Sequence, residues 1–529
     1  MNRRNFFELV TATAASASVI GKPIRAEFKW LEATVSDLRR GMESGKVSSA
    51  DLAKAYLRRI ERMDRKGPAV NSVIEVNPDA MAIAREMDRE RKAGKVRSPM
   101  HGIPVLLKDN TDTADKMLTT AGSLALMNCK PKRDAFLVRR LREAGAVILG
   151  KTNLSEWANF RSSRSTSGWS ARGGLTRNPY ALDRNTSGSS AGSGAAVAAN
   201  FCSVAVGTET DGSIVSPSSY CGIVGLKPTV GLVSRSGVIP ISKTQDTAGP
   251  MTRTVEDAAI LLGAMGGVDD EDEVTRESRE KTHKDYTQFL KRDGLRGARI
   301  GVARQYFRNR NEHSGRVIDE ALKAMKDEGA ELIDVEMPSF GKIGDAEFQV
   351  MLYEFKDGIE RYLATRDGCP HKNLADLIAF NEKHAEKELA VFGQETFLRA
   401  QEKGSLRDKA YLEALEKCGK LSREEGIDAV MDEHKLDAIV VPSGGPAHRT
   451  DLVWGDRGTG GISSPAAVSG YPSITVPAGF VTELPLGISF FGRGYSEPTL
   501  LKIAYAFEQA TRARRAPKFL ETVDGISGA

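Results

Sequence analysis

The spacing of apolar and polar positions changes repeatedly along the chain, between a helical period and short, continuously apolar runs. Apolar residues recur at helical spacing over 49–63 and within the charged segment 78–92, which predicts two helices. Apolar runs at 103–107 and 147–149 predict buried strands, and a helix is predicted between them near 134–144. Strands that alternate with helices in this way favour an α/β fold.

A long helical segment interrupts this alternation in the second half of the chain. The runs 299–303 and 331–335 predict strands on either side of a helix at 317–326. From 348 to 434 the pattern is one of long charged helices with few strand signals, which predicts a helical layer over the sheet or part of the entrance to a site. Strand and helix signals then return, at 436–442, 473–477, 486–491 and 497–512.

The region from 161 to 249 is rich in Gly, Ser and Thr, and it admits two interpretations. A flexible linker has this composition. However, apolar strand cores such as 203–206 lie within the region, and linkers lack them. We therefore expect a tightly turned core in which backbones approach closely.

Length and charge place only loose limits on the number of domains and on the kind of partner. The 529 residues exceed one average domain, but neither a repeat nor a shift in composition forces separate domains. We expect one large domain over 27–515 and a C-terminal tail at 516–529. The net charge of +5 is spread along the chain without a basic block, so we infer no nucleic-acid partner.

The cysteine and histidine patterns give no signal for metal binding or crosslinking. The 5 cysteines are few, odd in number and widely spaced, and no Cys-x-x-Cys pair occurs. Neither a zinc site nor a disulfide framework is therefore predicted. The 7 histidines are scattered as well, so we expect buried thiols and surface imidazoles.

The N-terminal residues resemble an export signal. The pair Arg3–Arg4 precedes two phenylalanines and an acid-free, mildly apolar stretch at 9–21. Paired arginines, aromatics and a small-residue region in this order are typical of a twin-arginine signal. We expect a signal peptide at 1–26 and export to the periplasm; the alternative is a basic, disordered start of a cytoplasmic protein. No later run of 18 apolar residues predicts a membrane-spanning helix.

Lys108 ends the apolar run 103–107 and is a candidate base. An ordinary lysine, with a pKa near ~10.4, is protonated at neutral pH and cannot accept a proton. Burial behind this run would lower its pKa by roughly two or three units. Asp109 would oppose that change, but successive side chains of a strand point to opposite faces, so the two need not pair. The alternative is a solvated strand end.

Ser189 lies in a segment of small residues that also contains Gly188, Gly192 and Gly194. Glycine-rich loops that open a helix can bind phosphate groups. A phosphate-binding loop of this kind would need a lysine after its second glycine, and none follows Gly194. The phosphate interpretation therefore fails, and close backbone packing is the alternative role of the glycines.

Ser213 follows Gly212 at a predicted strand, turn and helix. This geometry would expose the hydroxyl and direct consecutive backbone N–H groups at one point, as in an oxyanion hole. The motif is not the Gly-x-Ser-x-Gly elbow, since Asp211 and Val215 occupy the two glycine positions. A serine is too weakly acidic to attack an amide unless a base activates it, which is the part that Lys108 would play.

Together, Lys108, Ser189 and Ser213 resemble the Ser-cisSer-Lys triad of the amidase signature family. Further motifs, modest one by one but specific in their order, extend the resemblance over 30–515: Gly150-Lys-Thr-Asn-Leu-Ser-Glu156, Asn178-Pro179, Gly225-Leu-Lys-Pro228, Gln245-Asp-Thr-Ala-Gly-Pro250, Gly470-Tyr-Pro-Ser-Ile-Thr-Val-Pro477 and Leu486-Gly-Ile-Ser-Phe-Phe-Gly492. The resemblance implies an α/β fold, a single large domain with a mixed, twisted β-sheet sandwiched by α-helices.

The resemblance also implies a role for each residue of the site. Ser213 would be the nucleophile, Ser189 the bridging serine, usually preceded by a cis peptide bond, and Lys108 the base. Ser190 would support the network. The oxyanion hole would be formed by the backbone N–H groups of Thr210, Asp211, Gly212 and Ser213. Such a site cleaves amides through an acyl-enzyme and needs neither a metal nor an organic cofactor.

Two motifs depart from the family pattern. The common Gly-Gly-Ser-Ser-Gly-Gly is Ser187-Gly-Ser-Ser-Ala-Gly192 here, and the frequent Gly-Gly-Ser-Ile-Arg is Asp211-Gly-Ser-Ile-Val215. Val215 removes a charged group, which puts any role of that arginine in doubt. This version looks more like the peptide amidase branch, whose members deamidate peptide C-termini. The expected export and the segment 231–240 favour the same branch.

The sequence therefore predicts an exported, serine-dependent amidase of primary amides, with C-terminal peptide amides as favoured substrates. The alternatives are an A-type component of glutamyl-tRNA amidotransferase, a hydrolase of fatty or aryl amides, and a non-catalytic binding protein on the same fold. We expect the substrate pocket to draw on 348–434 and on the loops around Trp157, Trp169 and Trp454. The expected partner is a small or peptidic amide, with neither nucleic acid nor stable membrane association.

Overall fold

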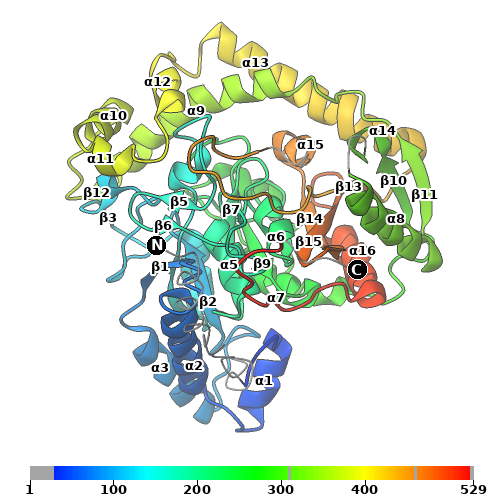
Figure 1. Ribbon diagram of the computed structural model, residues 1–529, viewed down its shortest axis with the longest axis horizontal. Coiled ribbons are helices and arrows are strands. Elements are labelled where there is room, and N and C mark those ends of the chain that lie inside the picture. The colour runs from blue at the N-terminus through cyan, green and yellow to red at the C-terminus, as the bar shows by residue number, and fades with distance from the viewer. Residues whose placement is uncertain (1–28, 308–310, 458–461, 525–529) are drawn as a thin grey trace, which may run out of the picture. The chain divides into compact units, whose positions relative to one another are not determined.

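The structure of the protein is a computed structural model that describes residues 29–307, 311–457 and 462–524 (Figure 1). From Glu32 onward the described residues belong to one compact unit. The signal peptide predicted at 1–26 lies outside the described residues, so export stays a prediction.

A mixed β-sheet of eleven strands runs through the described part of the chain. In their order across the sheet the strands are β1 (Val73–Val76), β4 (Val147–Thr152), β2 (Pro104–Lys108), β7 (Val204–Glu209), β9 (Thr247–Thr252), β8 (Val224–Lys227), β14 (Ser473–Val481), β15 (Leu484–Phe491), β13 (Ala438–Pro442), β10 (Arg299–Ala303) and β11 (Glu331–Val335). Strands β4, β2 and β7 are parallel to one another, as are β13, β10 and β11. The strands between these two groups pair antiparallel.

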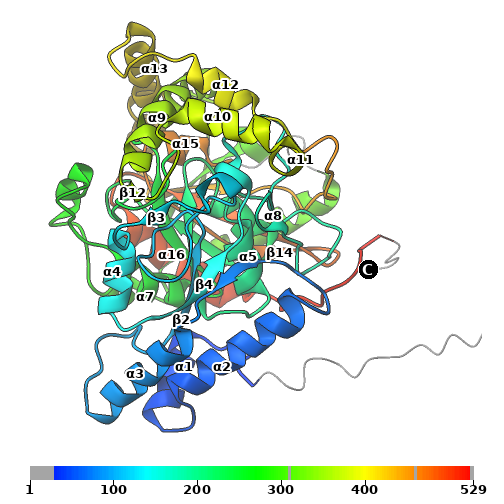
Figure 2. The same cartoon turned by 90° about the vertical axis from the view of Figure 1, so that its left-hand side faces the viewer.

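Helices cover both faces of this sheet (Figures 1 and 2). On one face α5 and α6 contact each other and pack on β7, β14 and β15, whereas α7, α16 and α8 form a chain of contacts over β9 and β14. The helices outside the segment 344–434 are α1 (Val35–Glu43), α2 (Ser49–Arg59), α3 (Ala80–Lys92), α4 (Phe136–Glu143), α5 (Ala191–Ala198), α6 (Val215–Tyr220), α7 (Val255–Met265), α8 (Glu312–Asp327), α15 (Ser464–Val468) and α16 (Glu497–Thr511). The sandwich predicted from the family resemblance is confirmed.

Most predicted elements are present, with small shifts at their ends. The predicted strands at 299–303 and 331–335 are β10 and β11 without change. The helix predicted over 49–63 begins at Ser49 because the Ser48 hydroxyl accepts a hydrogen bond from the Asp51 N–H, while the Asp51 carboxylate accepts one from the Ser48 N–H. The helix predicted at 317–326 begins earlier, at Glu312.

The region 161–249 is a core, as predicted, and not a linker. It contains β7, β8, α5, α6 and the start of β9, and nearly all of the residues in these elements are buried. A Cβ atom added to Gly192 at the start of α5 would stand 2.4 Å from the carbonyl oxygens of Asn153 and Ser72. The glycine is thus required by close backbone approach, which agrees with the packing interpretation of this segment.

The helical segment predicted at 348–434 forms a layer that we name the helical cap, residues 344–434. Its helices are α9 (Gly344–Ala364), α10 (Leu374–Lys383), α11 (Ala385–Glu388), α12 (Glu395–Gln401), α13 (Lys409–Gly419) and α14 (Asp428–His434). In Figure 1, α9 and α13 run side by side along the upper edge, and the two helices pack against each other. Leu352 and Phe355 of α9 pack with Ile239 and Ile241 in one apolar cluster, so the cap covers the loop that precedes β9.

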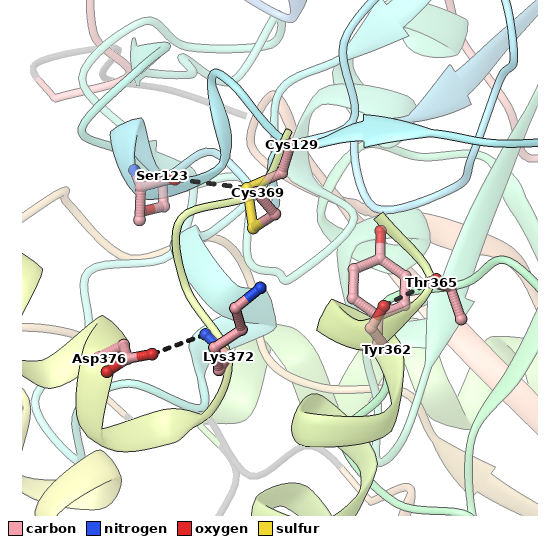
Figure 3. Close-up of a disulfide and its surroundings, with 8 residues drawn as sticks. Ser123, Cys129, Tyr362, Thr365, Cys369, Lys372 and Asp376 are labelled. Atoms are coloured by element: carbon pink, nitrogen blue, oxygen red, sulfur yellow. Dashed lines mark hydrogen bonds between the residues drawn. A yellow bond between two sulfur atoms is a disulfide. The ribbon is translucent and has the colours of Figure 1, made fainter. Parts of the chain in front are cut away.

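A disulfide ties the helical cap to the rest of the unit and corrects the sequence prediction. Cys129 and Cys369, 240 residues apart, are bonded (Figure 3). Cys129 lies just before β3 (Lys130–Pro131) and Cys369 just after β12 (Arg366–Asp367), and these two short strands pair antiparallel. This tertiary pairing brings the two cysteines together, and nothing in their spacing reveals it. The remaining cysteines are free and buried, as predicted: Cys202, Cys221 and Cys418.

None of the helices in the described part of the chain combines the length and the apolar character that crossing a membrane requires.

Candidate active site

Lys108 lies at the end of β2 with its side chain fully buried. Its Nζ donates hydrogen bonds to the Ser189 hydroxyl (2.8 Å), to the Thr208 hydroxyl (2.8 Å) and to the Thr208 carbonyl (3.3 Å). Burial lowers the pKa of Lys108 from 10.5 to about 7, although the negative charges of Asp246 and Glu209 oppose this change. A substantial fraction of Lys108 is therefore neutral near pH 7 and able to accept a proton.

Asp109, the next residue, is engaged elsewhere. It is also fully buried, and its carboxylate pairs with the Arg172 guanidinium at 3.1 Å and accepts a hydrogen bond from Thr120. Burial raises the pKa of Asp109, while the positive charges of Arg172 and Lys151 lower it. The prediction that adjacent side chains of this strand need not pair is confirmed, and Lys108 is left facing hydroxyl groups.

Ser189 and Ser190 connect Lys108 to the segment that carries Ser213. Both serines are fully buried immediately before α5, and the Gly188–Ser189 peptide bond is cis. The Ser190 N–H donates to the Ser213 carbonyl at 3.1 Å, and the Ser190 hydroxyl donates to the Thr208 carbonyl at 3.0 Å. Among the described residues, no hydrogen bond joins the Ser189 and Ser213 hydroxyls directly.

The turn between β7 and α6 presents free backbone N–H groups. Glu209, the last residue of β7, accepts hydrogen bonds from the N–H groups of Ile214 (2.7 Å) and Val215 (3.0 Å). By contrast, no acceptor among the described residues takes a hydrogen bond from the N–H groups of Thr210, Asp211, Gly212 or Ser213, the four residues of the predicted oxyanion hole. Gly212 has φ = 81°, a left-handed conformation that glycine adopts easily. This arrangement suits an anionic oxygen bound beside Ser213, which is 8% exposed.

Two residues of this network escaped sequence reasoning. The Thr208 hydroxyl accepts hydrogen bonds from both Lys108 and the Asn110 side-chain amide, the latter at 2.9 Å. Thr208 reaches Lys108 because β7 pairs parallel with β2, with Val206 opposite Leu107. Strand pairing is a tertiary property, so no local pattern points to Thr208. Asn110 follows Lys108 closely in sequence but carried no signal of its own.

A narrow cavity adjoins these residues. Its polar wall includes Ser189, Thr208 and Thr210, and its apolar wall includes Ile239 and Ile241. Because both isoleucines also pack against the helical cap, the cap supports this wall from behind. No residue of the cap is among those that line this cavity, so the prediction that the cap and the Trp157 loop contribute to the substrate pocket stays a prediction.

The three tryptophans whose loops are predicted to contribute to the pocket differ in their surroundings. Trp157 and Trp169 are buried against Phe397 and Phe392 of the helical cap, with ring centroids 5.6 and 5.1 Å apart. Ala158, the residue after Trp157, lines the cavity instead. Trp454 is 76% exposed on a loop. The first two rings thus pack the helical cap against the rest of the unit.

Comparison with known proteins agrees with this architecture. The family model described as Amidase matches residues 51–501. A probable amidase of Arabidopsis thaliana is 44% identical over 94% of this chain and 93% of its own length. The A-type component of the glutamyl-tRNA(Gln) amidotransferase from Thermoanaerobacter pseudethanolicus is 34% identical over 92% of this chain and 98% of its own length.

Among solved structures, the native peptide amidase of Stenotrophomonas maltophilia has 52% sequence identity and a TM-score of 0.89, covering 93% of this chain and 99% of that one. An amidase family protein of Bacillus anthracis has 37% identity and a TM-score of 0.84 over 92% of both chains. The chain therefore belongs to the amidase signature family of amide-hydrolysing enzymes.

Proposed function

We propose that this protein hydrolyses primary amides through Ser213, with C-terminal amides of peptides as its preferred substrates. The observation that carries the proposal is the buried Lys108, which is hydrogen-bonded to Ser189 and, among the described residues, to no carboxylate. A lysine in this setting can act as a base without histidine. The similarity to the Stenotrophomonas maltophilia peptide amidase supports the choice of substrate.

In the proposed acylation step, neutral Lys108 removes a proton from the Ser189 hydroxyl, which takes one from Ser213. The Ser213 Oγ forms a bond to the amide carbon, and the electron pair of the C=O bond moves to the oxygen. The free N–H groups of Thr210, Asp211, Gly212 and Ser213 form the oxyanion hole that stabilises this oxygen.

In the proposed second half of the reaction, the oxyanion collapses and the C–N bond breaks. The same relay returns a proton to the leaving nitrogen, so ammonia departs and an ester to Ser213 remains. Water then attacks the ester while the relay accepts one of its protons. The second oxyanion collapses, the bond between the carbonyl carbon and the Ser213 Oγ breaks, and the relay returns the proton to Ser213 as the carboxylic acid is released. The sum is amide plus water giving acid plus ammonia, and every proton moves between groups named here.

The second candidate is the A-type component of a glutamyl-tRNA amidotransferase. It is favoured by the 34% identity to such a protein over 98% of that chain. Val215 argues against it, because the position where the family often has arginine carries no charge here. In that case the enzyme would release ammonia from glutamine and would copurify with partner proteins.

Ammonia release by the purified full-length protein tests the proposal, with Ser213→Ala as the control. The substrates would be a C-terminally amidated dipeptide, a long-chain fatty amide and glutamine. We expect release from the dipeptide amide that Ser213→Ala abolishes. Preference for glutamine or the fatty amide would overturn the choice of substrate, and release that persists in Ser213→Ala would overturn the nucleophile.

We also propose that the protein is exported. The pair Arg3–Arg4 and the stretch that follows support this proposal, as does the Cys129–Cys369 disulfide, since such bonds persist mainly in oxidising compartments. Expression in bacteria followed by fractionation tests it. Recovery in the periplasm that is lost when both arginines are replaced by lysine is expected, and cytoplasmic recovery of the native chain would contradict it.

A further inference from the structure

A side chain of the helical cap reaches the turn that carries the free N–H groups. Glu347 lies in the first turn of α9 and is only 4% exposed. The Gln245 side-chain amide donates one hydrogen bond to the Glu347 carboxyl at 2.9 Å and another to the Thr210 carbonyl at 3.3 Å. A single amide thus connects the cap to the residue before Asp211.

The carboxyl group of Asp211, the next residue of this turn, has one bonded oxygen and one oxygen without a donor among the described residues. Its Oδ2 accepts a hydrogen bond from the Ser464 hydroxyl at 2.7 Å. Its Oδ1 is buried, and no donor among the described residues reaches it. The Gln245 amide holds the Glu347 carboxyl beside Thr210, the residue before Asp211, and the two carboxyl groups interact electrostatically. Two carboxylates cannot bond to each other, whereas a protonated carboxyl can donate to a carboxylate.

The surroundings of Glu347 favour its protonated form. The titratable groups that face it are Asp211 from the turn after β7 and Cys418 from α13. Burial, and then the negative charge of Asp211, raise the pKa of Glu347 well above its usual range. Burial also raises the pKa of the Cys418 thiol to about 12, so this group stays neutral. Among the described residues, no basic side chain forms an ion pair with Glu347.

We propose that Glu347 is a positioning residue of the reaction: its protonated carboxyl donates a hydrogen bond to Asp211 and thereby holds the 210–213 turn in its productive shape. This inference rests on the proposed function, which assigns the N–H groups of that turn to the oxyanion hole. Loss of the proton from Glu347 places two negative charges in contact and displaces the turn. Activity therefore has two pH limits, a rise set by Lys108 and an alkaline decline set by Glu347.

The test is the pH profile of kcat and KM for ammonia release by the full-length enzyme. Glu347→Gln keeps a donor toward Asp211 at every pH, so it should retain kcat near neutrality and lose the alkaline decline. Glu347→Ala should lower kcat by roughly tenfold or more, a smaller loss than the ~10²–10³-fold that follows removal of an oxyanion donor, with a lesser change in KM. Rescue by the amide but not by alanine distinguishes positioning from packing.

Glu354→Gln is the matched control. Glu354 is a second buried carboxyl of α9, and it bonds to Ser242 and Tyr411 rather than to the 210–213 turn. Its variant should keep the alkaline decline. If Glu347→Gln keeps the decline, or if Glu354→Gln also loses it, the proposal is overturned.

Asp211→Asn provides a second route if Glu347→Gln does not fold, as judged by thermal melting. It removes the charge that opposes ionisation of Glu347, so the alkaline decline should again vanish, and its persistence would overturn the proposal. Failure of the proposed function would be seen separately, as activity that survives Ser213→Ala.

Discussion

Two buried lysines at the ends of neighbouring parallel strands, Lys108 on β2 and Lys151 on β4, occupy similar positions but have different surroundings. Both side chains are fully buried, and each ammonium donates to one threonine hydroxyl and one backbone carbonyl. Burial lowers the pKa of both. Lys108 differs in that it also donates to the Ser189 hydroxyl.

The two lysines differ more in the carboxylates that surround them than in the burial of their side chains. The carboxylates that act on Lys151 are those of Asp109, Asp112, Asp115 and Glu75. Those that act on Lys108 are Asp246 and Glu209, both buried, with the pKa of Asp246 raised to about 6. Burial is the larger influence at both lysines, and more carboxylates oppose it at Lys151 than at Lys108. We therefore expect Lys108 to serve as the base and Lys151 as a structural cation.

The largest expected effect comes from removing the proposed base. Lys108→Ala should lower kcat for the preferred amide by about 10³-fold or more, because general-base catalysis contributes ~10²–10⁴-fold and no other basic side chain among the described residues bonds to Ser189 or Ser213. The fold should be retained, since the change removes a buried amine. Steady-state ammonia release and a thermal melt measure the two quantities. A folded variant that remains active at neutral pH would refute the assignment of the base.

Lys151→Met should have the reverse effect to Lys108→Ala: stability should fall, and activity should stay close to native. Removing this cation leaves the buried Thr111 carbonyl and Thr119 hydroxyl without their donor and removes a positive charge near Asp109 and Asp112, so the free energy of unfolding should fall by ~1–3 kcal/mol. The variant that does fold should keep a kcat close to native, because Lys151 donates to Thr111 and Thr119 and not to a serine of the site. Urea unfolding and activity per folded molecule are the measurements. A stable but inactive variant would show that the two lysines share the chemistry.

Hydrophobic periodicity could predict the strands that carry both lysines but not the difference between them. The apolar runs 103–107 and 147–149 end close to Lys108 and Lys151 alike, so periodicity alone gives them the same signal. The family motifs singled out Lys108, Ser189 and Ser213. What separates the lysines arises from strand pairing and from loops distant in sequence, which no local pattern encodes. The disulfide was missed for the same reason.

A smaller effect should follow from Thr208→Val, which keeps the shape of the side chain and removes the hydroxyl. The Lys108 ammonium and the Asn110 amide both lose an acceptor, and unmade buried hydrogen bonds cost ~1–3 kcal/mol each. We expect kcat to fall by roughly 10–100-fold at its optimum. Because that hydroxyl stabilises the charged lysine, the pKa of Lys108 should fall further and the acid limit of activity should move to lower pH. A profile that moves to higher pH, or does not move, would contradict this role of Thr208.

The smallest expected effect is on stability as a function of pH. The pKa of Lys108 is lowered to about 7 in the folded protein from 10.5, so between these values the unfolded chain binds more protons than the folded one. This group therefore makes the folded state more stable as the pH rises from about 7, by up to ~1.4 kcal/mol per pH unit, and below pH 7 its unfavourable contribution is fully present. Lys108→Met lacks the contribution, whereas every other titrating group is common to both proteins. Urea unfolding at pH 7, 8 and 9 should show the native protein gaining stability relative to the variant, and a constant difference would mean that Lys108 keeps an ordinary pKa and cannot be the base.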